Sequence, residues 1–185
     1  SNPEWVAADL IAQAEHDNFA QSILISSNEK IISQVNFYIN QQLKNLPKKK
    51  IAEKSLKNFG LAIYVKNKKK LIETINLIAP EHLEILIKKP NEIIKKITNV
   101  GSIFIGNYSP EAMGDYIAGT NHVLPTSGAA KFSSGLSVND FLKRHSLIKI
   151  TKSGIERLGT SVINLANYEN LEGHANSVKI RMKKD

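Results

Sequence analysis

Strand-like runs alternate with helical patterns from the start of the chain to residue 105. The helical patterns cover residues 3–17, 28–46, 49–58, 67–78 and 90–98, and the strand-like runs cover residues 22–25, 61–65, 83–87 and 102–105. Helices of this length between strands are typical of βαβ crossovers, which place successive strands parallel to one another. The sequence therefore predicts an α/β fold with a mostly parallel sheet flanked by helices.

The sequence around Gly60 predicts a helix end followed by a buried strand. Gly60 follows the helical pattern 49–58 and is expected at its C′ position, where glycine commonly ends a helix. The apolar run Leu61–Val65 that comes next predicts a buried strand.

The pattern changes after Tyr108. Residues 106–137 contain glycines and prolines too often for long regular elements, so a long functional loop is expected there. Beyond it the sequence predicts a short helix over 137–143, a strand-like run over 146–150, and helices over 152–167 and 169–180. This tail has no core partner of its own, so we expect it to pack on another domain or subunit.

Composition limits the classes of protein to which the chain can belong. Its 185 residues are 42% hydrophobic and contain no cysteine, which excludes a disulfide framework and a cysteine nucleophile. Any metal must then be held by histidine, carboxylate, amide or water ligands. No apolar run approaches the roughly 18–20 residues of a membrane span, and the N-terminal residues do not resemble a secretory signal. We therefore expect a cytoplasmic protein that does not enter a membrane.

The net charge of +8 is concentrated in one stretch. Residues 44–70 contain ten lysines and a single acid, Glu53, so this stretch carries +9 and the rest of the chain about −1. The stretch has no arginine, and its aromatic residues, Phe59 and Tyr64, are expected to be buried. Nucleic-acid surfaces combine arginine with exposed aromatics. We therefore expect a solvated lysine-rich face and no nucleic-acid partner.

Histidines beside carboxylate or amide groups are the first candidates for chemistry. Gln13 and His16 lie three residues apart on the first predicted helix, so they could grip one ion, although a surface pair has the same spacing. Glu81 and His82 follow Pro80 at the entry to a strand. An irregular strand end would let both face one substrate, with the histidine as a general base, although an exposed pair also explains the spacing.

Four further residues are weaker candidates when taken singly. Asp115 and His122 fall in the glycine-rich region, where loops often present functional groups but where aspartate also stabilises turns. Glu169 and His174 belong to the predicted tail and have the spacing of helix-surface groups. The chain has no P-loop, G-x-S-x-G or G-x-G-x-x-G motif, so it contains no recognisable phosphate cradle.

Seven short blocks carry the most distinctive sequence of the chain: Ala8–His16, Ala79–Leu83, Gly114–Tyr116, Gly119–Thr126, Phe132–Ser137, Asp140–Arg144 and Glu172–Ala175. In content, order and spacing these blocks resemble histidinol dehydrogenases, over essentially the whole chain. The resemblance implies a zinc enzyme of histidine biosynthesis that oxidises L-histidinol through the aldehyde to L-histidine with two NAD.

The resemblance also implies a role for each candidate residue. The implied zinc ligands are Gln13, His16, Asp115 and His174. Glu81 is implied to activate water for the aldehyde step, and His82 to take the alcohol proton as general base. The residues implied to contact the substrate are Gln13, His16, His82, Asp115, His122, Glu169 and His174.

The domain organisation is implied in the same way. Residues 1–143 would form an incomplete Rossmann-like α/β domain with most of the site, and residues 144–185 a small helical tail that reaches the other subunit of a homodimer. Chains of the family are more than twice as long, and their NAD contacts and an upstream substrate-binding serine have no counterpart here. We therefore expect a C-terminal portion that is inactive alone.

Two other functions stay open on the residues themselves. The same ligands could serve a zinc-dependent hydrolase in which Glu81 acts on a metal-bound water and no nucleotide is used. The lysine-rich stretch could instead make the chain a non-catalytic binding module for anionic partners, with steep salt dependence.

Overall fold

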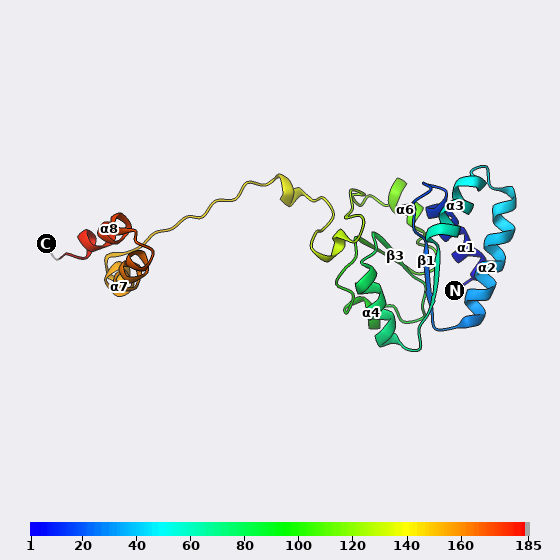
Figure 1. The fold of residues 1–185 in the computed structure, drawn as a ribbon, viewed down its shortest axis with the longest axis horizontal. Helices are drawn as coiled ribbons and strands as arrows, with labels where there is room; N and C mark the ends of the chain where they lie inside the picture. Colours follow the sequence, from blue (N-terminus) through cyan, green and yellow to red (C-terminus); the bar gives the residue numbers. More distant parts are fainter. Residues whose placement is uncertain (184–185) are drawn as a thin grey trace. The chain divides into compact units, whose positions relative to one another are not determined.

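The computed structural model describes residues 1–183, which divide into two compact units, Ser1–Phe141 and the residues from Leu142 onward (Figure 1). In the first unit the helices are α1 (Pro3–Ala14), α2 (Glu29–Gln42), α3 (Lys49–Phe59), α4 (Lys68–Ile78), α5 (Asn91–Ile94) and α6 (Glu111–Tyr116). The strands are β1 (Ile23–Ser26), β2 (Leu61–Tyr64), β3 (His82–Ile85) and β4 (Ser102–Ile105). The second unit contains α7 (Lys152–Tyr168) and α8 (Glu172–Met182). The predicted α/β class, with helices at the C-terminal end, is confirmed.

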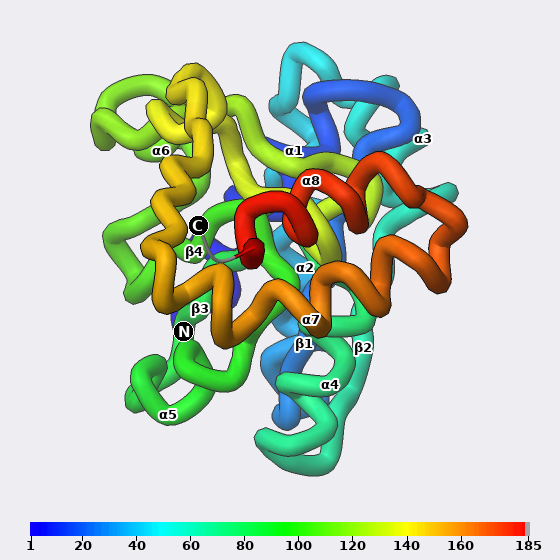
Figure 2. Tube along the Cα trace, turned by 90° about the vertical axis from the view of Figure 1, so that its left-hand side faces the viewer, coloured from blue at the N-terminus to red at the C-terminus, as the bar shows by residue number. Residues whose placement is uncertain are grey.

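The four strands form two parallel pairs (Figure 2). β1 pairs with β2, and β3 pairs with β4, with His82 opposite Ser102. The parallel direction agrees with the predicted crossovers, but the single sheet is replaced in residues 1–183 by two sheets of two strands. Residues Ser22–Ser27 and Glu81–Ile87, which contain β1 and β3, line one cleft of about 870 Å³.

Helix α1 holds the core of the first unit together. Asn2 caps it by accepting a hydrogen bond from the Glu4 N–H at 2.9 Å, and Pro3 occupies its first position. Its buried residues enter two apolar clusters with α2, α3 and the 3₁₀ turn between them. In Figure 1, α1, α2 and α3 lie on one side of β1 and α4 lies on the other. This packing fixes the face of α1 that carries Asp9 and Gln13 along the cleft.

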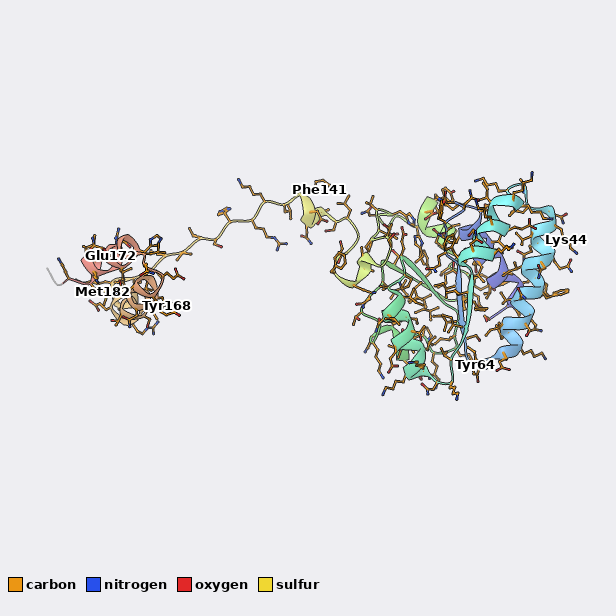
Figure 3. The ribbon with its side chains drawn as sticks, in the orientation of Figure 1. Lys44, Tyr64, Phe141, Tyr168, Glu172 and Met182 are labelled. Atoms are coloured by element: carbon orange, nitrogen blue, oxygen red, sulfur yellow. The ribbon has the colours of Figure 1, made fainter. Side chains whose placement is uncertain are left out.

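Strand β2 is not buried as the sequence predicted. Leu61 is 51% exposed and Tyr64, at the end of the strand in Figure 3, is 47% exposed; only Val65, just beyond, is buried. The prediction is wrong because side-chain burial depends on what packs against the faces of a strand, and the side chains of β2 are mostly uncovered within residues 1–183. Phe59 is half-buried.

The elements after Tyr108 also differ from the prediction. Helix α6 lies inside the expected loop. It was not predicted because it contains Gly114, and glycine is more typical of loops than of helices. Residues 137–143 form only a 3₁₀ turn, Val138–Phe141, and residues 146–150 form no strand. Leu147 is 94% exposed, which shows that the strand-like run lacks the partner that a strand requires.

The second unit is a pair of packed helices. Thr151 caps α7 by accepting a hydrogen bond from Gly154 N–H at 3.1 Å, and Gly159 leaves room for the Met182 side chain of α8. None of the helices in residues 1–183 combines the length and the apolar composition that a bilayer crossing demands.

Gly60 ends α3 in extended rather than left-handed conformation, with φ −68°, so the predicted C′ geometry is wrong. It is required for space, because an added Cβ would lie 2.5 Å from Leu56 O. We expect Gly60→Ala to lower the free energy of unfolding by about 1–3 kcal/mol. Asn58→Ala, at an exposed position of the same helix, should change it by less than about 0.5 kcal/mol. Urea denaturation measures both, and equal effects would refute the steric explanation.

Candidate active site

Four titratable side chains converge in the first unit: His82, Glu111, Asp115 and His122. One ligand atom from each lies within 4.8 Å of the others. His82 Nε2 is 3.2 Å from His122 Nε2, and the two rings stack at 5.0 Å with an interplanar angle of 9°. Glu111 Oε1 lies 3.7 Å from His82 Nε2 and 3.8 Å from His122 Nε2, and Asp115 Oδ1 contacts His122 Nε2. We call this group the His–carboxylate cluster.

The chain turn before β3 positions Glu81 and His82. Ala79 ends α4 in the left-handed conformation with φ 53°, and Pro80 follows it. The Glu81 carbonyl then accepts a hydrogen bond from Ser102 N–H at 2.8 Å, which joins the start of β3 to the start of β4. A non-glycine residue in this conformation is costly, and it is retained here directly beside the site.

Helix α6 and the following loop position the other three members. Glu111 and Asp115 are four residues apart on α6 and therefore share a face. Gly114 packs against the Phe104 ring, because a Cβ there would lie 2.6 Å from the ring. His122 follows Asn121, whose side-chain oxygen accepts a hydrogen bond from Val123 N–H at 3.0 Å. These local contacts bring His122 back over α6.

Burial shifts the pKa values of His82 and Glu81 in opposite directions. The shifts favour a neutral imidazole on His82 and make the Glu81 carboxylate a stronger base. Desolvation lowers the pKa of His82, whose side chain is 16% exposed, and the charge of His122 lowers it further while Asp115 opposes the shift. Desolvation also raises the pKa of Glu81, partly offset by His122. His82 is therefore uncharged at neutral pH and can accept a proton.

Three acidic residues were missed in the sequence: Glu111, which belongs to the cluster, and Asp9 and Glu84, which lie beside it. The Glu84 carboxylate accepts a hydrogen bond from Glu111 N–H at 2.8 Å, and the nearby Asp9 carboxyl helps to raise the pKa of Glu84. Burial and like charges raise the pKa of Glu84 and of Glu111 to about 7. The spacing could have identified two of them. Glu84 is two residues after His82 on a strand and Asp9 is four residues before Gln13 on a helix, so each lies on the same face as a predicted site residue.

The implied zinc ligands are only partly grouped in the first unit. Gln13 lines the cleft together with Glu81 and His82. His16 lies just past the end of α1, exposed, and close enough for its charge to influence the pKa of both Glu81 and His82. Asp115 belongs to the His–carboxylate cluster.

The other two predicted site residues belong to the second unit. Glu169 is the C-cap of α7, and His174 lies in the first turn of α8, and both are exposed. The structure describes the two units separately, so the positions of Glu169 and His174 relative to the cluster stay a prediction.

The donor atoms suit a metal ion. Asp115 Oδ1 is buried and, apart from its contact with His122, receives no hydrogen bond of acceptable geometry in residues 1–183. A buried carboxylate oxygen without a donor is costly, and a cation would satisfy it. Histidine nitrogens and carboxylate oxygens match the preferences of Zn²⁺.

Comparison with known proteins identifies close relatives. The family model described as histidinol dehydrogenase matches residues 1–182. The chain is 56% identical to histidinol dehydrogenase of Pelagibacter ubique and 48% identical to that of Prochlorococcus marinus, covering 100% and 98% of this chain but 43% and 41% of those proteins. The crystal structure of histidinol dehydrogenase from Elizabethkingia anophelis matches 98% of this chain and 42% of that chain, at 42% identity and a TM-score of 0.91.

The raised pKa of Glu84 predicts a pH dependence of stability. The pKa is about 7 in the folded chain against 4.5 in an unfolded one, so the folded state binds more protons between these values. The contribution to stability is therefore complete below pH 4.5 and is lost as pH rises through 7. We expect Glu84→Gln to make the fall in melting temperature between pH 5 and pH 8 shallower, as measured by circular dichroism.

The matched control is Glu73→Gln, which removes an exposed carboxylate paired with Lys70 at 3.4 Å. It should leave the slope unchanged. An unchanged slope in Glu84→Gln as well would show that Glu84 does not carry the effect.

Proposed function

The chain belongs to the histidinol dehydrogenase family, and we propose that it supplies the metal-binding and acid–base part of an enzyme that oxidises L-histidinol to L-histidine. The reaction passes through L-histidinaldehyde and reduces two NAD. The observation that carries the proposal is the convergence of His82, Asp115 and His122 in one half-buried cluster next to Glu81.

The chain spans less than half the length of the curated relatives that it matches. We propose that the NAD contacts come from the part of those relatives that has no counterpart here, and that this chain does not turn over alone. We further propose a cytoplasmic homodimer in which Glu169 and His174 reach the site of the other subunit.

Gln13, His16, Asp115 and His174 are the proposed zinc ligands. Bound there, zinc would orient the imidazole of the substrate and polarise the reacting group. The donor-free oxygen of Asp115 and the position of Gln13 along the cleft support this set.

In the proposed first step, His82 takes the proton of the alcohol while the carbinol hydride passes to NAD⁺, which leaves the aldehyde. The lowered pKa of His82 supports this role, because only the neutral imidazole can accept the proton. Holding the carbinol beside His82 couples proton removal to hydride departure.

In the proposed second step, Glu81 takes a proton from water as the water oxygen adds to the aldehyde carbon. The resulting hydrate anion gives its hydride to the second NAD⁺ and becomes the carboxylic acid. The raised pKa of Glu81 makes it a stronger base than an exposed glutamate, which supports the assignment. His122 and Glu169 are proposed to hold the substrate.

Separating the two oxidations tests these roles. The chain would be co-expressed with the upstream part of the Pelagibacter ubique relative, and NADH formation followed by absorbance. We expect His82→Gln to reduce turnover of L-histidinol by roughly 10²–10⁴-fold. We expect Glu81→Gln to reduce turnover of L-histidinaldehyde by a similar factor and that of L-histidinol to the aldehyde much less. Equal losses on both substrates in both variants would contradict the division of roles.

The same preparation distinguishes the alternatives. A zinc-dependent hydrolase would need no NAD, and a lysine-rich binding module would show neither oxidation nor zinc dependence. NAD-dependent oxidation would exclude both as the main function.

Calorimetry of L-histidinol binding tests the metal role in the chain itself. We expect heat of binding from the zinc-loaded chain and its loss after chelation, because the imidazole of the substrate binds through the ion. Binding of equal strength after chelation would contradict the proposed role of zinc.

A further inference from the structure

Helix α6 is too short to be stable by itself. It has only 6 residues, and an isolated helix of that length does not persist in water. Its N-cap is Pro110, which has no side-chain oxygen to accept a hydrogen bond from the first N–H groups of the helix. Gly114 in its interior lowers its helix propensity further. Contacts with other parts of the chain must therefore fix its position.

Two facing residues of the β3–β4 pair supply these contacts. Glu84 on β3 lies opposite Phe104 on β4. The Glu84 carboxylate accepts the hydrogen bond from Glu111 N–H at 2.8 Å, so a residue 27 positions away in the sequence caps the helix. The Phe104 ring packs against Gly114, where an added Cβ would lie 2.6 Å from the ring. Glu84 and Phe104 therefore hold the first and the fourth residue of α6.

Both residues lie close to His82. Glu84 follows His82 by two residues on β3, so the two side chains share one face of the strand. The ring centroids of His82 and Phe104 are 6.2 Å apart. Asp115 directly follows Gly114 on α6. The position of Asp115 relative to His82 therefore depends on how α6 packs on Glu84 and Phe104.

We propose that Glu84 is a positioning residue: by capping α6 from β3, it holds Asp115 at the distance from His82 that the metal and acid–base site requires. The proposed mechanism assigns no step to the Glu84 carboxyl group itself. The consequence for zinc rests on the proposed function, whereas the capping role stands without it.

The capping role requires an acceptor oxygen and not a negative charge. Glutamine keeps an acceptor oxygen at the end of a side chain of the same length, whereas leucine has none. We therefore expect Glu84→Leu to release the start of α6, and Glu84→Gln to keep it in place.

Amide hydrogen exchange in the full 185-residue chain, followed by NMR, tests the cap directly. We expect Glu84→Leu to raise the exchange rate of the Glu111 N–H at least about tenfold, because local opening of α6 becomes easier. Glu84→Gln should retain the protection. Equal protection in the unchanged chain and in Glu84→Leu would overturn the proposal, and so would a loss of protection in Glu84→Gln as large as that in Glu84→Leu.

Zinc calorimetry on the same variants tests the consequence for Asp115. We expect Glu84→Leu to weaken the Kd for Zn²⁺ roughly 10–100-fold, as is typical when a contact that orients a ligand is removed, and Glu84→Gln to restore it. In the chain co-expressed with the upstream part of the Pelagibacter ubique relative, raised zinc should recover oxidation by Glu84→Leu. Loss of the fold would not be reversed in this way.

Glu73→Leu is the matched control, because that carboxylate pairs with Lys70 at the surface; exchange at Glu111 and the Kd should stay unchanged. Circular dichroism verifies folding. If Glu84→Leu does not fold, Gly114→Ala displaces α6 from its Phe104 contact instead and should produce the same two effects.

The two readouts separate this inference from the proposed function. Absence of zinc binding in the unchanged chain would contradict the proposed function, and exchange at Glu111 would still decide whether Glu84 caps α6. Faster exchange in Glu84→Leu with an unchanged Kd for Zn²⁺ would overturn the link from Glu84 to Asp115.

Discussion

The hydrogen bond between Glu111 N–H and the Glu84 carboxylate connects the sheet to the helix that carries half of the cluster. Glu84 is on β3 together with His82, and Glu111 is the first residue of α6, so this one contact sets the distance between them. Its cost is the burial of three carboxyl groups, Asp9, Glu84 and Glu111, each with a raised pKa. The start of α6 is thus held by carboxyl groups whose pKa values burial raises.

The sequence predicts correctly those features that depend on a few consecutive residues. It fails for features, such as burial, that depend on residues distant in the sequence. The strand Ser102–Ile105 and the strand entry after Pro80 were predicted because periodicity and Pro80 act within a few residues. The burial of β2 was predicted wrongly, because burial depends on what lies against a strand and not on its own apolar residues. Glu111 was missed because Gly114 made a real helix resemble a loop.

The glycines of this chain illustrate the same limit. The sequence pattern indicates a helix end at Gly60 and a loop at Gly114, yet neither glycine has a positive φ in the structure. Both are glycine because another group occupies the space of a Cβ, the Leu56 carbonyl in one case and the Phe104 ring in the other. Sequence periodicity does not reveal such close contacts. From the sequence alone, a glycine that packs within a functional helix, as Gly114 does, therefore cannot be distinguished from one that ends a helix, as Gly60 does.

Burial acts on Glu81 and His82 in opposite directions, and this bears on how one site could perform two successive oxidations. The pKa of an isolated glutamate lies well below that of an isolated histidine, so an exposed Glu81 would be a poor base beside His82. Desolvation raises the pKa of Glu81 and lowers that of His82, because it disfavours the charged form of each. Desolvation therefore brings the pKa values of the two side chains closer together. Under the proposed function, the degree of burial matters as much as the identity of the two residues.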